Sequence, residues 1–72
     1  MKNEFLEKLG AKIKNARQEH GFTQDEIAKK IGVHPTYVGK IEGGKSNPSA
    51  LMLFKISRAL KINLYNVFEF DR

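Results

Sequence analysis

The side chains best suited to binding a partner are concentrated between residues 34 and 47. This stretch contains hydroxyl groups, an amide, a histidine and two lysines, which suit a partner with anionic groups and hydrogen-bonding edges. No nucleophile stands beside a base and an orienting group, as covalent catalysis requires. The sequence has no cysteine, and His20 lies far from His34, so no metal-ligand spacing is present. We therefore expect no enzyme activity, no metal site and no cofactor.

The net charge also favours an anionic partner. Thirteen lysines and arginines against eight acidic residues give a formal charge of +5 and a pI near 9.7. Many small domains are basic without binding an anion, so charge alone leaves the partner open. No apolar run approaches the ~20 residues of a membrane span, and the N-terminus mixes charged with apolar residues, unlike a signal peptide. We expect a cytoplasmic protein with no membrane association and no small-molecule ligand.

The elements that position these side chains are expected to be helices. A length of 72 residues predicts one domain over residues 1–72, and its core must rest on well-ordered helices or on a partner chain. Apolar residues recur at spacings of three and four from Leu6 to Ala16, which predicts a first helix over about residues 4–20. Glycine, proline and asparagine breakers predict four more helices, over about residues 23–31, 35–43, 49–60 and 63–69. No strand pattern competes with them, so the predicted fold class is all-α, a compact five-helix domain.

The second and third of these helices form the most informative pattern. Thr23 and Glu26 have the spacing of a capping box, which marks the start of the second helix. Gly32 suits a turn with positive φ, and Pro35 suits the first position of the next helix. Two short helices joined by a glycine-containing turn are typical of a helix-turn-helix motif. We place this motif at about residues 24–43.

The chain resembles the phage-repressor type of helix-turn-helix domain, the XRE/Cro family, over nearly its whole length. The resemblance includes small stand-alone members such as the controller proteins of restriction–modification systems. The residues that carry it are Ala16-Arg17, Gly21-Phe22-Thr23-Gln24, Ile27-Ala28, Ile31-Gly32-Val33, Tyr37-Val38, Ile41-Glu42-Gly43-Gly44-Lys45, Asn47-Pro48-Ser49 and Ala59-Leu60. It implies a lambda-repressor-like fold, binding of double-stranded DNA through the third helix, and a two-fold homodimer.

The sequence departs from the family's common pattern at several positions. Lys61 replaces the usual glycine after the fourth helix, so a non-glycine residue is expected to take a positive φ, at some cost in energy. Gly39 interrupts the third helix, at about 1 kcal/mol relative to alanine. Pro35 stands where relatives often place a polar side chain that reads bases.

The resemblance assigns roles to individual residues. It implies a partly buried ion pair between Arg17 and Glu42, which would fix the angle of the third helix. It places Gln24 on a phosphate of the DNA backbone, because an amide at a helix N-terminus suits a phosphate oxygen.

The outward face of the third helix is expected to read bases. If Val38 and Ile41 face the core, the predicted readers on the opposite side are Pro35, Thr36, Gly39 and Lys40. Thr36 offers a hydroxyl and a methyl group, and Lys40 can donate to guanine. The predicted phosphate ligands are Gln24, His34, Tyr37, Gly43, Lys45 and Asn47. Tyr37 could equally cover the edge of the core, and Gly43 and Gly44 are expected to leave free backbone amides.

The C-terminal part has more apolar side chains than one small core can hide, and such surplus usually marks a partner surface. The family's dimers use the fifth helix and its surroundings, so we expect a homodimer interface built from Leu51, Tyr65, Phe68 and Phe70. A tail that folds back on its own monomer is the alternative. The predicted function is a sequence-specific transcriptional regulator on a near-palindromic operator; the alternative is the antitoxin of a toxin–antitoxin pair with the same DNA-binding module.

Overall fold

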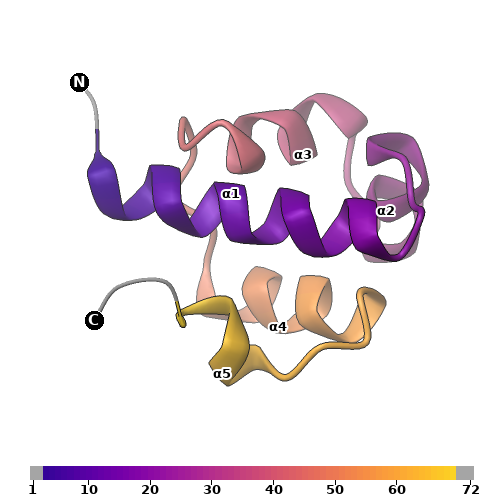
Figure 1. The fold of residues 1–72 in the computed structure, drawn as a ribbon. Helices are drawn as coiled ribbons and strands as arrows, with labels where there is room; N and C mark the ends of the chain where they lie inside the picture. The colour runs from indigo at the N-terminus through magenta and orange to yellow at the C-terminus, as the bar shows by residue number, and fades with distance from the viewer. Residues whose placement is uncertain (1–2, 70–72) are drawn as a thin grey trace.

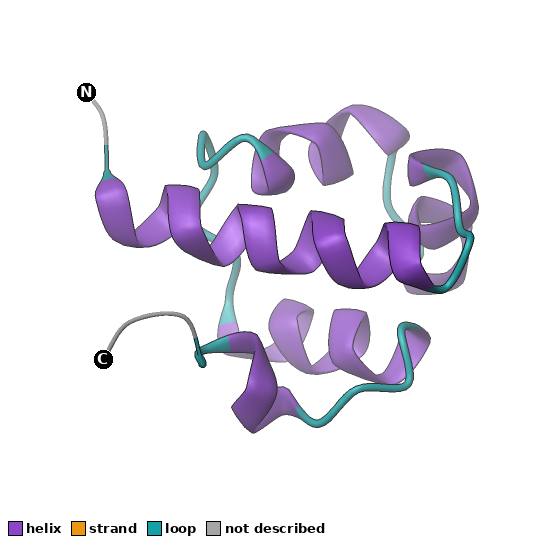
Figure 2. Cartoon of the chain, viewed as in Figure 1, coloured by secondary structure: helices purple, strands orange, loops and turns teal. Residues whose placement is uncertain are grey.

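The computed structural model describes residues 3–69, and within that range the chain forms helices and no strand. The helices are α1 (Glu4–Glu19), α2 (Gln24–Ile31), α3 (Pro35–Glu42), α4 (Ala50–Ala59) and α5 (Leu64–Val67). The predicted all-α, five-helix fold is therefore confirmed (Figure 2). The fifth helix is shorter than the expected 63–69, and Phe70 lies outside the described residues.

Long helix α1 runs across the molecule, with α3 on one side of it and α4 and α5 on the other (Figure 1). Helix α2 packs against both α3 and α4, while α1 packs against α3 and α5. The core between them contains Leu9, Ile13, Ala16, Ile27, Ala28, Ile31, Val38, Ile41, Leu53, Ile56, Leu60 and Val67. Each of these residues lies on the helix face that its spacing predicts.

Polar side chains fix where the helices begin. The Thr23 hydroxyl accepts a hydrogen bond from the Glu26 amide at 3.1 Å, and the Glu26 carboxylate accepts one from the Thr23 amide at 2.8 Å. This is the predicted capping box, and it satisfies amides that the first turn of α2 would leave unpaired. Helix α3 begins similarly, because Nδ1 of His34 accepts from the Thr36 amide at 3.1 Å. The start of α3 is therefore set by the histidine that precedes it.

Helices α2 and α4, which pack against each other, are each followed by a residue with a left-handed backbone conformation. Gly32 closes α2 with φ of 76°, a conformation that glycine adopts without steric cost. Lys61 follows α4 with φ of 56°, as expected from its position. Its side chain makes that conformation cost roughly 1–2 kcal/mol, which the surrounding packing must offset.

Helices α1 and α3 approach so closely that their contact depends on glycine. A Cβ atom on Gly10 would lie 2.5 Å from the carbonyl oxygen of Glu42 and closer still to that of Ile41. A Cβ atom on Gly44 would lie 2.7 Å from Cα of Glu7. The sequence analysis did not single out Gly10, yet this residue sets the spacing between α1 and the last turn of α3.

No helix within residues 3–69 is long and apolar enough to cross a membrane.

Replacing Gly10 by alanine should lower the free energy of unfolding by about 1–3 kcal/mol, because the new methyl group collides with backbone that cannot move aside. The matched control is Gly39→Ala in α3, where the nearest atoms to a Cβ are side-chain atoms of Gln24 at 3.6 Å or more. That change should stabilise the protein by up to about 1 kcal/mol through helix propensity. Urea unfolding followed by circular dichroism measures both. Stabilisation by both substitutions would contradict the close packing of α1 on α3.

Candidate nucleic-acid interface

The outward surface of α3 is narrower than its sequence predicts. Val38 and Ile41 are buried, and Thr36 and Lys40 are exposed on the other side of the helix. Pro35 is half-buried and lines a hollow between α2 and α3 instead of projecting freely. Gly39 is also half-buried, and its Cα faces the side chain of Gln24. Of the four predicted base readers, Thr36 and Lys40 are thus the two with freely exposed side chains.

Behind this surface, a buried carboxylate joins three helices. Nε of Arg17 donates to Glu42 Oε2 at 2.6 Å, and Nη2 donates to Oε1 at 3.1 Å. The remaining terminal nitrogen, Nη1, donates to the backbone carbonyl of Phe22 at 2.7 Å. Arg17 is only 8% exposed and Glu42 only 7%. The structure thus pairs the two residues that the resemblance pairs, in a geometry where both charges are satisfied.

Gln24 is part of the same network. Its Nε2 donates to Glu42 Oε1 at 2.9 Å, so the carboxylate receives donors from α1 and from α2. The sequence analysis missed this bond, since nothing local distinguishes a glutamine that faces inward from one that faces solvent. One hydrogen of the Gln24 amide is therefore engaged. A phosphate contact at this place would rely on the second amide hydrogen and on the backbone.

The start of α2 still offers free donors. The Thr23 and Glu26 amides are paired in the capping box. The backbone N–H groups of Gln24 and Asp25 have no acceptor within residues 3–69. Free amides in the first turn of a helix, together with the positive end of its dipole, suit a phosphate oxygen.

The loop after α3 differs from expectation. The prediction that Gly43 and Gly44 leave free amides is wrong, because the Gly43 amide donates to the Gly39 carbonyl at 3.0 Å and the Gly44 amide to Ile41 at 3.1 Å. The Lys45 amide likewise donates to the Lys40 carbonyl at 2.8 Å. These bonds satisfy carbonyls that the end of α3 would otherwise leave unpaired. The donors that remain exposed here are the side chains of Lys45 and Asn47.

The two aromatic residues beside the reading surface have separate surroundings. His34 is exposed, and because its Nδ1 accepts the capping bond, a neutral ring carries its hydrogen on Nε2. The Tyr37 ring is half-buried and packs against the core. Tyr37 thus covers the edge of the core, which leaves its phenol hydroxyl as the group available for a phosphate.

Large apolar side chains are exposed on the side of the molecule formed by α4, α5 and the start of α1. Tyr65 is 71% exposed, Leu51 63% and Phe68 41%. Phe5 stacks on Phe68 with ring centres 6.2 Å apart, a contact that the sequence analysis did not identify. Three of the four predicted dimer residues are therefore accessible, and the fourth, Phe70, lies outside the described residues.

Comparisons with known proteins agree with this geometry. The family model described as Helix-turn-helix matches residues 13–65. An uncharacterized HTH-type transcriptional regulator of Archaeoglobus fulgidus is 38% identical over 63 residues, covering 88% of this chain and 90% of that protein. The antitoxin HipB of Escherichia coli O6:H1 is 36% identical over 56 residues, covering 78% of this chain and 60% of HipB.

A solved structure shares the whole architecture. The restriction-modification controller protein C.AhdI from Aeromonas hydrophila superposes with a TM-score of 0.85 at 32% sequence identity. The match covers 88% of this chain and 96% of that one. The lambda-repressor-like arrangement of helices therefore extends beyond the motif, over the 88% of the chain that the match covers.

Removing one partner from the buried network should be far more costly than removing the whole pair. Arg17→Ala leaves the Glu42 carboxylate buried with Gln24 as its remaining side-chain donor, and should lower stability by about 3–5 kcal/mol. The double replacement Arg17→Met with Glu42→Leu should recover most of that loss, because apolar side chains need no donors. Thermal unfolding measures both.

The control for this prediction is Lys8→Ala, which removes an exposed ion pair with Glu4 at 3.9 Å. Such a pair contributes at most about 1 kcal/mol. If Arg17→Ala had the same melting temperature as Lys8→Ala, the Glu42 carboxylate would not need its arginine.

Proposed function

The chain belongs to the helix-turn-helix family of DNA-binding transcriptional regulators, and we propose that it acts as a homodimer on a near-palindromic operator. It regulates transcription by occupying that site, with no cofactor. The observation that carries this proposal is the exposed pair Thr36 and Lys40 on a helix held from behind by buried charges.

Base reading is assigned to that pair. Lys40 donates to the O6 and N7 atoms of guanine, and Thr36 contacts a base edge or a thymine methyl group. Pro35 contributes apolar contact only, at the rim of the hollow against α2. Gly39 has no side chain with which to contact a base, and a Cβ atom at this position would face Gln24. Specificity therefore rests on few side chains in each half-site, which makes a second half-site necessary.

Phosphate contacts position the protein on both sides of α3. On one side are the free amides of Gln24 and Asp25 at the start of α2. On the other are the side chains of Lys45 and Asn47, while His34 and Tyr37 flank the reading surface. Contacts of this kind fix register without reading sequence. The formal charge of +5 supports them at long range.

The homodimer is supported by the exposed apolar side chains. Leu51, Tyr65 and Phe68 come from α4 and the end of the chain, away from α3. A second copy related by a two-fold axis would cover them and would place two α3 helices about 34 Å apart, one turn of DNA. The area that one small domain leaves uncovered is then buried between two.

The antitoxin role is the second candidate, because HipB is among the similar proteins. In that role the protein would use the same DNA-binding surface and would also bind a toxin protein. Co-expression with the neighbouring gene distinguishes the two roles, since an antitoxin leaves purification as a stable complex of two different chains.

Selection from random duplex DNA should return a two-fold symmetric motif with half-sites one helical turn apart. Lys40→Ala should change which bases are selected, with a loss of about 1–3 kcal/mol of discrimination at one position in each half-site. Lys45→Ala is the matched control, because it removes the same group from a phosphate-contacting position and should weaken all sequences alike. Identical sequence preferences for the two variants would rule out Lys40 as a reader.

A charge placed on the apolar side should separate the two copies. Tyr65→Glu should give a folded monomer, because Tyr65 contributes little to the core of one copy, and this monomer should bind the full operator no better than a half-site. Sedimentation equilibrium and DNA titration measure these two effects. The control is Gln18→Glu, an exposed position on α1 with the same change in charge. A wild-type chain that stays monomeric at high micromolar concentration would contradict the dimer.

A further inference from the structure

A basic hollow lies between α2 and α4, apart from the surface assigned to DNA. It has a volume of about 700 Å³ and is lined by the C-terminal half of α2, the C-terminal half of α4 and Lys61. No residue of α3 or of the loop after it lines the hollow. Helix α2 packs on both α3 and α4. The hollow lies where α2 meets α4, whereas the proposed base-reading helix is α3.

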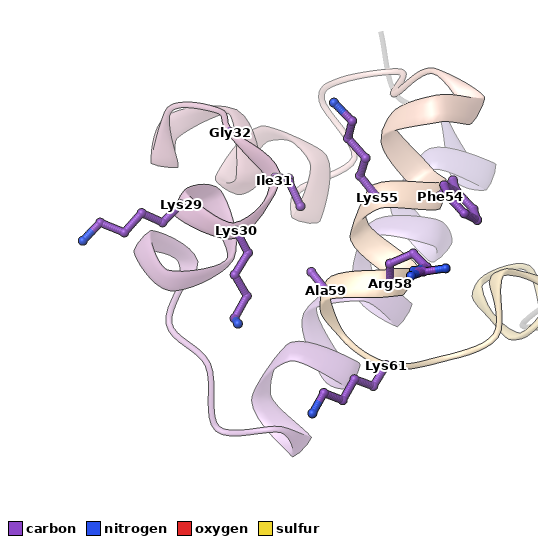
Figure 3. A pocket seen from close by; sticks show the side chains of 9 residues that line it. All are labelled: Lys29, Lys30, Ile31, Gly32, Phe54, Lys55, Arg58, Ala59 and Lys61. Carbon is purple, nitrogen blue, oxygen red and sulfur yellow. The ribbon is translucent and has the colours of Figure 1, made fainter.

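The hollow combines an apolar floor with a cationic rim. In Figure 3, Ile31 and Ala59 point toward the space between α2 and α4, and Phe54 stands on the far side of α4. Five cations line the hollow, namely Lys29, Lys30, Lys55, Arg58 and Lys61. Figure 3 shows Lys29 directed away from α4 and Arg58 beside Phe54 on the far side of α4, which leaves Lys30, Lys55 and Lys61 as the cations of the rim. None of these five cations has an acidic partner within residues 3–69, and no acidic side chain from that part of the chain lines the hollow.

An aromatic ring limits the movement of one cation of the rim, Lys30, and another ring holds Arg58 on the far side of α4. The Lys30 ammonium lies 5.2 Å from the centre of the Phe22 ring, and the Arg58 guanidinium lies 5.7 Å from the centre of the Phe54 ring. Such contacts limit the freedom of a long side chain without neutralising its charge. The rim is thus partly ordered before any partner arrives, which reduces the entropy that binding would cost.

The strained residue of the fold is part of the same rim. Lys61 holds φ of 56°, where glycine would fit without a steric penalty. Its side chain is exposed and lines the hollow. Backbone strain of this kind is a reason to look for a function of the side chain involved. Here the side chain supplies a cation to the hollow.

We propose that this hollow docks a short acidic and apolar segment of a second protein while α3 occupies DNA. Carboxylates of the segment pair with Lys30, Lys55 and Lys61, and its apolar side chains cover Ala59 and the aliphatic carbons of the lysine side chains around it. A duplex backbone offers phosphates but no apolar groups to cover that floor, so the charge pattern together with the floor favours a protein partner. This inference goes beyond the proposed operator binding, since it gives the regulator a contact with another protein.

The test is a titration of the intact, isotope-labelled protein with a synthetic helical peptide that carries glutamates on one face and leucines on the other. Amide resonances of residues 29–32 and 54–61 should shift, and those of α3 should not. A peptide with serine in place of leucine should bind more weakly. Shifts confined to α3 and residues 43–49, or equal binding of the two peptides, would overturn the proposal.

Matched variants separate docking from general charge attraction. Lys55→Glu should weaken peptide binding about fivefold or more, whereas Lys14→Glu, an exposed lysine in α1 with the same charge change, should have a much smaller effect. Lys61→Gly removes a rim cation at a backbone position where glycine is favourable, and should also weaken binding while preserving the fold. Equal losses for Lys55→Glu and Lys14→Glu would show that net charge alone attracts the peptide.

Two further arms distinguish other occupants. Duplex DNA without an operator, and inorganic polyphosphate, are titrated in the same way, and stronger shifts in the hollow with either one would show that the site takes a polyanion rather than a protein. Shifts in the hollow that follow protein concentration alone would make a second copy the occupant and overturn the proposal. The Lys55→Glu and Lys14→Glu variants should select the same operator sequences. The test of peptide docking is therefore independent of the test of DNA recognition.

Discussion

The position of α3 depends on the hydrogen bonds that the buried carboxylate of Glu42 accepts from α1 and α2. An ionised group in this setting is tolerated only when donors surround it, and here Arg17 supplies two and Gln24 one. Those donors come from α1 and from the first position of α2, while Glu42 itself is the last residue of α3. A rotation of α3 about its axis would break at least one of these bonds. The network therefore contributes orientation more than net stability, since an apolar replacement of similar volume can be equally stable.

Steric contacts act at the same end of the helix. Gly10 brings the backbone of α1 against the carbonyls of Ile41 and Glu42, and Gly44 brings the chain against Glu7 one turn earlier. At the other end, His34 caps α3, and Pro35 is half-buried beside the hollow that it shares with α2. Both ends are thus fixed to the same scaffold, and the exposed side chains of Thr36 and Lys40 project from a rigid backbone. Under the proposed function, a reading helix that is fixed at both ends binds DNA without an ordering cost of its own.

Whether a feature could be predicted from the sequence depends on how far apart along the chain the interacting residues are. The capping box at Thr23 and the turn at Gly32 depend on neighbouring residues, and the sequence predicted both. The positive φ of Lys61 was expected from the resemblance, because the family usually has glycine at this position. The core followed from helical periodicity. Gly10 could not be recognised, because its importance comes from a helix some thirty residues away, and the inward turn of Gln24 depends on Glu42 in the same way. The prediction of free amides at Gly43 and Gly44 was wrong for a different reason. The way in which α3 ends leaves carbonyl groups without donors, and these two amides bind them.

Helix α2 connects the two binding surfaces proposed for this chain, and its two ends attract anions by different means. At its start, free backbone amides and the positive end of the helix dipole favour a phosphate. At its end, the dipole disfavours anions, and Lys29 and Lys30 must outweigh it. The phosphate site proposed at the start of α2 therefore survives most side-chain substitutions, because its donors belong to the backbone. The hollow beside α4 depends wholly on side chains, so single substitutions can remove its preference for acidic partners and leave operator binding intact.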